Sequence, residues 1–159
     1  MNKRAVLQKI IGKLTEELGV YFRAAQNSRA EATHEQNKAE SKYDTRGLEA
    51  SYLARGQSRQ AAELEAAIAE FEKLEVRKFA ASEPIDLGAL VELEMDGEKS
   101  LYFLGPRAGG TEIVQDRREI LVITPPSPLG AQLLARKQGD RLQLELAGRR
   151  EPARILSVT

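Results

Sequence analysis

The absence of proline from the first 79 residues is the feature that most constrains how this chain can fold. All six prolines of the 159 residues lie at or after Pro84, and eight of the twelve glycines lie beyond residue 79. Because proline ends helices and glycine weakens them, the first half can form long, uninterrupted helices. The second half is interrupted often, as in a small β-rich domain, and we expect the junction at residues 80–84.

Apolar residues in the first half recur at alternating spacings of three and four, which place them on one face of a helix. One such seam consists of Leu7, Ile11, Leu14, Leu18 and Tyr21, and continues through Ala25, Ser28 and Ala32. A second seam consists of Ala61, Leu64, Ile68 and Phe71. Turn and capping residues lie between the seams, at 44–47. We therefore predict an antiparallel helical hairpin, a coiled coil, over residues 1–79 with its tip near 43–48.

The second half, residues 80–159, alternates short apolar strands around one helix. Asp96-Gly97 is a typical hairpin turn, and Ser127-Pro128 is an N-cap followed by proline at the first helical position. We expect strands at 90–94, 100–104, 120–123, 141–146 and 153–158. We also expect a helix over 129–137 that buries Leu129, Leu133 and Leu134 and ends at Gly139-Asp140. The fold class predicted for the whole chain is therefore α+β.

Composition excludes several kinds of chemistry. The chain has no cysteine and one histidine, which rules out disulfides, thiolate catalysis and zinc sites made of cysteine or of several histidines. The 24 basic and 24 acidic residues cancel, so no overall field attracts nucleic acid or membrane. The sequence has no apolar run near the roughly 18 residues of a transmembrane helix and no signal-peptide pattern. We expect a soluble, cytoplasmic protein without a membrane partner.

The run over residues 120–146 combines a strand, Ser-Pro, a helix with paired leucines, Gly-Asp and a second strand. With the long hairpin before it, this run resembles the bacterial Gre transcript-cleavage factors over nearly the whole chain. The resemblance implies an FKBP-like C-terminal domain that docks on bacterial RNA polymerase. It implies a hairpin that enters the secondary channel of the polymerase. It also places the docking surface near Pro125, Pro126, Ser127 and Pro128.

The resemblance further implies that two acids at the hairpin tip help to hold a Mg²⁺ ion shared with the polymerase, which activates water to cut backtracked RNA. Asp44 and Glu49 are the acids available for catalysis and metal binding, and no stably bound cofactor is expected. The tip departs from the family pattern, because alignment on Tyr52 puts Leu48 where the family has Glu. Asp44 and Glu49 could still converge if Gly47 bends the turn.

Basic residues near the tip have two interpretations. By the resemblance, Arg46 and Arg55 are candidates for contact with the nascent RNA 3′ segment through its phosphates. The alternative is a solvated helix face with ion pairs between successive turns. Asp44 and Glu49 likewise suit an N-cap and a first-turn acid, and the proline-rich loop suits a rigid strand-to-helix connection.

Three functions follow from these interpretations. The first is a transcription elongation regulator that binds RNA polymerase and donates tip acids, without being an enzyme by itself. The second is a factor that enters the channel and inhibits or modulates the polymerase without cleavage. The third is a dimeric coiled-coil scaffold, whereas the first two predict a monomer when free. A prolyl isomerase rests on fold analogy alone, because the second half has few aromatic residues to line a proline pocket.

Overall fold

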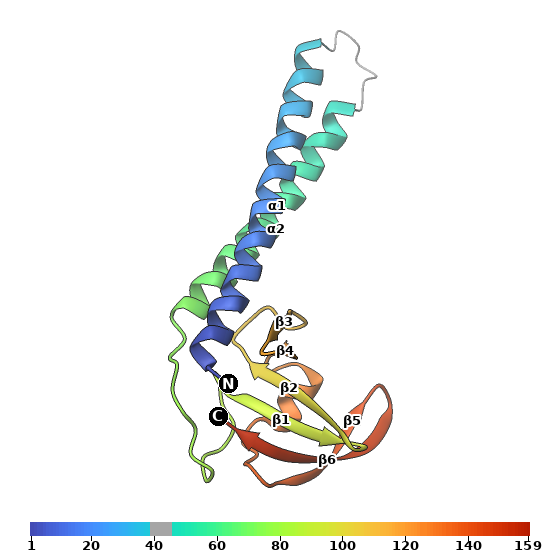
Figure 1. Ribbon diagram of the computed structural model, residues 1–159. Helices are drawn as coiled ribbons and strands as arrows, with labels where there is room; N and C mark the ends of the chain where they lie inside the picture. Colours follow the sequence, from blue (N-terminus) through green and yellow to red (C-terminus); the bar gives the residue numbers. More distant parts are fainter. Residues whose placement is uncertain (39–45) are drawn as a thin grey trace. The chain divides into compact units, whose positions relative to one another are not determined.

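The structure is a computed structural model that describes the backbone of residues 1–38 and 46–159, and the side chains of residues 1–24, 27 and 59–159. Two long helices come first, α1 (Lys3–Lys38) and α2 (Arg46–Glu72), and they run side by side in opposite directions (Figure 1). The predicted α+β fold with an N-terminal helical hairpin is confirmed. Of the predicted tip, residues 43–45 lie outside the described part of the chain, and 46–48 lie in α2.

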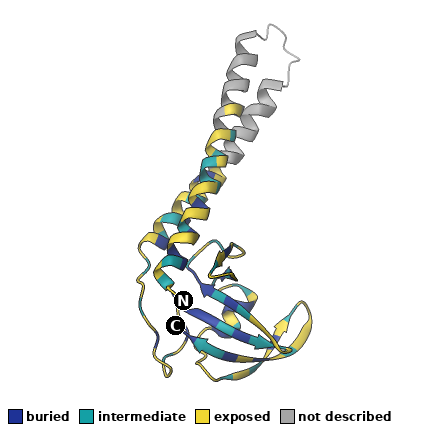
Figure 2. Ribbon diagram, viewed as in Figure 1, coloured by how far each residue is buried: buried dark blue, intermediate teal, exposed yellow. Residues whose placement is uncertain are grey.

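The predicted seam describes α1 only in part. Leu7 and Leu14 are buried, whereas Ile11, Leu18 and Tyr21 are only half-buried. Two apolar residues outside the seam, Val6 and Ile10, are fully buried (Figure 2). Near its start, α1 therefore buries a wider face than one coiled-coil seam requires.

The wider buried face is explained by how the chain divides into two compact units. The first unit contains Met1–Ile11 together with Ala69–Thr159, and the second contains Gly12–Ile68. The start of α1 and the end of α2 thus share a core with the C-terminal half, which a helical period alone does not reveal. The predicted division into residues 1–79 and 80–159 separates the two long helices from the strands. As a division into domains it stays a prediction.

The first unit contains a six-stranded sheet with the strand order β3-β4-β2-β1-β6-β5. All neighbouring strands are antiparallel except β2 and β4, which are parallel. The strands are β1 (Leu90–Met95), β2 (Glu98–Leu104), β3 (Glu112–Gln115), β4 (Arg118–Ile123), β5 (Arg141–Leu146) and β6 (Arg149–Val158). Five of them were predicted, whereas β3 was not.

The hairpin turns explain which strands the sequence reveals. Asp96 and Gly97 both have positive φ angles, 51° and 77°, so the predicted turn between β1 and β2 is confirmed. The β3–β4 turn uses Asp116 and Arg117, with φ angles of 51° and 63°. Because neither of these residues is glycine, the turn has no sequence signal that separates β3 from a loop.

Each face of the sheet carries a core. On one face, α3 (Pro128–Leu133) buries Leu129 and Leu133 in a cluster with residues of β1, β2, β4, β5 and β6. On the other face, Phe103 of β2 meets Phe71 of α2, with ring centroids 6.4 Å apart. The end of α2 is therefore anchored on the sheet by aromatic packing.

The helix after Pro128 is shorter than predicted. It ends at Leu133 rather than Lys137, and Leu134 is 37% exposed instead of buried. Beyond Leu133 the chain pairs with Ile85, since Ala135 N–H donates to Ile85 C=O at 3.0 Å and Ile85 N–H donates to Arg136 C=O at 2.7 Å. These backbone bonds with a residue 50 positions earlier replace the last predicted turn of the helix.

Candidate docking surface and hairpin tip

The loop between β4 and α3 is closed by one serine side chain. Ser127 Oγ donates a hydrogen bond to Thr124 C=O at 2.6 Å and accepts one from Gly130 N–H at 3.1 Å. Ser127 is therefore the N-cap of α3, as predicted, and Pro128 occupies the first helical position. Together with the neighbouring prolines, these bonds fix the backbone of the loop before any partner arrives.

Gly130 makes this closed loop sterically feasible. A Cβ atom at this position would lie 1.9 Å from Thr124 O and 2.8 Å from Ser127 Oγ. Only a residue without a side chain lets the first turn of α3 pass so close to the loop. The sequence contains Gly130, but nothing in the local pattern indicates this close approach.

Apolar side chains on the outer side of this segment face solvent. Pro128, Ala131 and Leu134 are exposed and follow one another at a spacing of three, and Pro126 is exposed beside them. Residues three apart lie on the same side of a helical turn. We call these four residues the loop surface. The sequence analysis did not identify this surface, because it placed Leu134 in the core. Leu134 is exposed instead, since α3 ends at Leu133.

Gln132 connects the loop surface to the edge of the sheet. Its side-chain amide donates to Pro128 C=O at 2.8 Å and to Glu145 C=O at 3.0 Å. Its side-chain oxygen accepts from Glu145 N–H at 2.7 Å. One side chain thus holds α3 against β5, and this function has no signal in the sequence.

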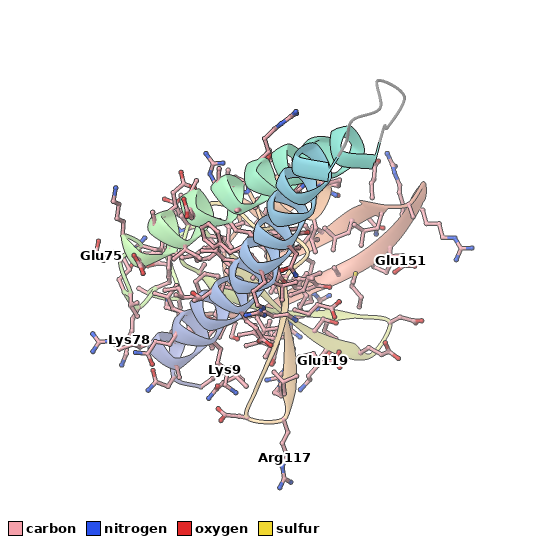
Figure 3. All side chains as sticks on the ribbon, turned by 90° about the horizontal axis from the view of Figure 1, so that it is seen from above. Lys9, Glu75, Lys78, Arg117, Glu119 and Glu151 are labelled. Carbon is pink, nitrogen blue, oxygen red and sulfur yellow. The ribbon has the colours of Figure 1, made fainter. Side chains whose placement is uncertain are left out.

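Polar contacts fasten the ends of the hairpin helices within the first unit. Lys9, labelled in Figure 3, belongs to α1. Its Nζ donates to Val114 C=O of β3 at 2.6 Å, and Arg107 Nε donates to Oε2 of Glu70 in α2 at 2.6 Å. Both contacts are exposed, so each contributes about 1 kcal/mol or less to stability. The packing of Phe71 is the larger contribution, and the polar contacts add to it within the first unit.

A cluster of charges lies around Phe79 in the first unit. The Arg77 guanidinium lies 3.8 Å from the Phe79 ring centroid and Lys3 Nζ lies 4.8 Å from it. Burial and the nearby Arg77 lower the pKa of Lys3 from 10.5 to about 8. Hydrogen bonds from Arg77 and from Ala80 N–H hold the pKa of the Glu83 carboxyl below its usual range.

The predicted tip residues are described only in part. Asp44 lies outside the described residues. Arg46 begins α2, and Glu49 and Arg55 lie further along it, but their side chains are outside the described part. Gly47 lies within α2, so the backbone is helical there and does not make the bend through which Asp44 and Glu49 could converge. The catalytic, metal-binding and RNA-contact assignments of Asp44, Glu49, Arg46 and Arg55 stay predictions.

The donor set available for a metal ion is small. Among the residues that the structure describes, no three His, Asp or Glu side chains gather in a way that could hold a metal ion. Asp44 and Glu49 would offer two carboxylates, which suits Mg²⁺ bound with waters and phosphate oxygens rather than in a cage built by this chain alone.

Among the residues that the structure describes, no helix has the length and apolarity to cross a membrane.

Comparison with known proteins gives similar solved structures. The chain matches no protein-family model and no curated protein sequence. A structure of the GreA factor homolog 1 (Gfh1) protein of Thermus thermophilus is 22% identical over 94% of both chains, with a TM-score of 0.40. Thermus aquaticus Gfh1 is 23% identical over 92% of both chains, also with a TM-score of 0.40. The transcription elongation factor GreA/GreB from Nitrosomonas europaea is 20% identical over 60% of this chain and 78% of its own, with a TM-score of 0.37.

Proposed function

We propose that this protein is a transcription elongation regulator that binds bacterial RNA polymerase through its C-terminal domain and inserts its helical hairpin into the secondary channel. The loop surface is the observation that carries the proposal. It presents Pro126, Pro128, Ala131 and Leu134 to solvent on a backbone already fixed by the Ser127 cap. A rigid apolar surface loses little conformational entropy when a partner binds.

The hairpin supports the second part of the proposal. With 36 residues, α1 is about 54 Å long at 1.5 Å per residue. Its start is anchored in the first unit by buried Val6, Leu7 and Ile10. A slender element of this length, fixed at its base, can reach a site far inside a channel of a larger partner.

The tip would supply the chemistry. In the complex, Asp44 and Glu49 would contribute carboxylate oxygens to a Mg²⁺ ion shared with the polymerase, and Arg46 and Arg55 would contact phosphates of the nascent RNA 3′ segment. The ion would activate the water that cleaves backtracked RNA. On this proposal the protein contributes ligands to the active site of the polymerase and is not an enzyme by itself.

A second candidate is a regulator that enters the channel without stimulating cleavage. The helical conformation of Gly47 favours it, because convergence of Asp44 and Glu49 depends on a bend at this glycine. The presence of Leu48 at the position of the family's glutamate also favours a regulator without cleavage activity. The two candidates share the docking surface and differ only at the tip.

RNA cleavage in a stalled, backtracked elongation complex tests both candidates. For a cleavage factor, we expect Mg²⁺-dependent shortening of the transcript that is lost in Asp44→Ala and reduced in Glu49→Ala. A Leu134→Asp variant should lose both cleavage and competition with a Gre factor, because it places a charge on the loop surface. Val76→Asp is the matched control, since Val76 is a similarly exposed apolar residue, at 39%, elsewhere in the same unit.

The results separate the functions. Competition without cleavage would establish the non-cleaving regulator. Absence of both would refute polymerase binding and favour the scaffold, which light scattering would detect as a dimer. If Leu134→Asp and Val76→Asp behave alike, the loop surface is not the docking site.

A further inference from the structure

Two arginines stand directly opposite each other on the sheet. Arg141 of β5 pairs with Arg154 of β6, and Arg154 pairs in turn with Glu94 of β1. Side chains in directly opposed positions lie on the same face about 5 Å apart at Cβ, and like charges there are destabilising. Across these three strands a single carboxylate therefore accompanies two guanidinium groups.

Further along the same face of β5 and β6, two opposite charges stand across from each other. There Glu145 of β5 stands opposite Arg150 of β6, and their side chains form an ion pair at 2.9 Å. Within the described part of the chain, the side chains of Arg141 and Arg154 form no ion pair or hydrogen bond. Both guanidinium groups are therefore available to bind a negatively charged group of a partner.

The arginine pair borders a groove of about 520 Å³. Its lining includes Arg141, Arg154 and Gln143 from the β5–β6 hairpin, and Glu94 and Asp96 from the end of β1 and the turn that follows. The groove is open to solvent and large enough for one or two side chains of a partner. Glu94 and Asp96 in its wall disfavour a chain of phosphates, because successive negative charges would meet them. A single carboxylate beside Arg141 avoids them, because β6 lies between β5 and β1.

The backbone of β5 is also open on its outer side. The strand order ends at β5, so among residues 1–38 and 46–159 no further strand covers this edge. Gln132 occupies the outward N–H and C=O of Glu145. Since outward groups alternate along a strand, those of Gln143 and Arg141 point the same way as those of Glu145. These two residues can pair with an added strand.

We propose that an extended acidic segment of a partner protein binds along β5, pairs its backbone with Arg141 and Gln143, and places a carboxylate at the Arg141 end of the row, where both guanidinium groups attract it. A carboxylate accepts paired hydrogen bonds from a guanidinium group. It would extend the charge row formed by Glu94, Arg154 and Arg141 with a second negative group. Gln132 would set the end of the binding site, because it already occupies the next outward position.

A peptide titration of the ¹⁵N-labelled full-length protein tests this proposal. The probe is the peptide acetyl-Val-Glu-Val-Glu-Val-amide, and its control is the same peptide with Gln in place of both Glu. We expect saturable shifts of the Arg141 and Gln143 amide signals and at least about tenfold weaker binding of the Gln peptide. The assay contains no polymerase, so its outcome is independent of the proposed function.

Variants of the protein identify the residues responsible. Arg141→Gln and Arg154→Gln should each weaken binding of the Glu peptide at least about fivefold. Arg149→Gln should leave it unchanged, because Arg149 is exposed on the same hairpin but does not line the groove. All three positions are exposed, so the variants should keep their folded spectra.

Several results would overturn the proposal. These are the absence of saturation up to about 5 mM peptide, equal binding of the Gln peptide, and equal loss in Arg149→Gln. An eight-nucleotide single-stranded DNA that displaces the peptide with the same arginine dependence would also overturn it, in favour of a nucleic acid site.

Discussion

Replacement of Gly130 by alanine should destabilise the domain strongly, although alanine is the better helix former. The added Cβ would lie 1.9 Å from Thr124 O and 2.7 Å from Thr124 C, and both are backbone atoms. No side-chain rotation can relieve this overlap, so α3 and the loop must separate. Separation of these segments would break the hydrogen bonds of Ser127 Oγ to Thr124 C=O and from Gly130 N–H.

The magnitude follows from these contributions. Insertion of a methyl group into a closely packed site costs about 1–3 kcal/mol, and each lost hydrogen bond about 1 kcal/mol. The higher helix propensity of alanine returns at most about 1 kcal/mol. We therefore expect the free energy of unfolding to fall by about 3 kcal/mol in Gly130→Ala.

Gly12→Ala is the matched control, because the same methyl group is added in open space. Apart from the backbone of its own helix and the adjacent residues, no atom of the described residues lies within 4 Å of a Cβ built on Gly12, which is inside α1. This variant should be stabilised by about 0.5–1 kcal/mol through helix propensity alone.

Urea unfolding measures the stability of both variants. NMR signals of β-strand residues report on Gly130→Ala, and signals of α1 residues report on Gly12→Ala, because Gly12 lies in the second unit. A Gly130→Ala protein within about 0.5 kcal/mol of the wild type would refute the argument, since it would show that the loop can move at no cost. Stabilisation of both variants would mean that helix propensity outweighs the close approach.

Three further predictions concern the same unit. Phe71→Ala should lower the free energy of unfolding by about 3–5 kcal/mol in urea titrations, because the ring is fully buried against Phe103; a loss below about 1 kcal/mol would contradict this anchor. Gln132→Ala should speed amide hydrogen exchange of Glu145 at least about tenfold, because that N–H loses its acceptor; unchanged exchange would show that the contact is not persistent. Burial and Arg77 disfavour the charged form of Lys3 and give it a pKa of about 8, so stability should rise between about pH 8 and pH 10.5, where the unfolded chain binds more protons. Because Lys3 is partly exposed, the gain should be about 1 kcal/mol or less; Lys3→Met should lack this rise in urea titrations at each pH, and equal slopes for both proteins would refute the assignment.

Much of the fold could be predicted from local patterns. The absence of proline and the recurrence of apolar residues at spacings of three and four predicted two long helices. Alternation of apolar and polar residues predicted five of the six strands. The Ser127 cap followed from its residue type and position, and the structure confirms its hydrogen bonds. Each of these features is formed by residues close together in the chain, so a single segment carries its signal.

The candidate docking surface could be predicted only roughly. The proline-rich loop was identified, but the exposure of Leu134 and the bridging role of Gln132 were not. Both depend on Ile85 and Glu145, which are distant in the sequence and pair with the segment only after the sheet has formed. At the hairpin tip, the acids Asp44 and Glu49 were selected from the sequence, and their roles stay predictions.

The sequence by itself determined the order and type of the elements, because hydrophobic period, caps and turn residues act over a few neighbouring positions. Only the tertiary structure decided which residues share a core. Val6 and Ile10 are buried because the start of α1 joins the unit that contains the sheet. Likewise, Gly130 is required by a carbonyl six residues earlier, and Arg141 meets Arg154 through strand register. Strand register arises between segments distant in the sequence, and the close approach at Gly130 depends on how the loop from Thr124 closes, so the pattern of residue types reveals neither.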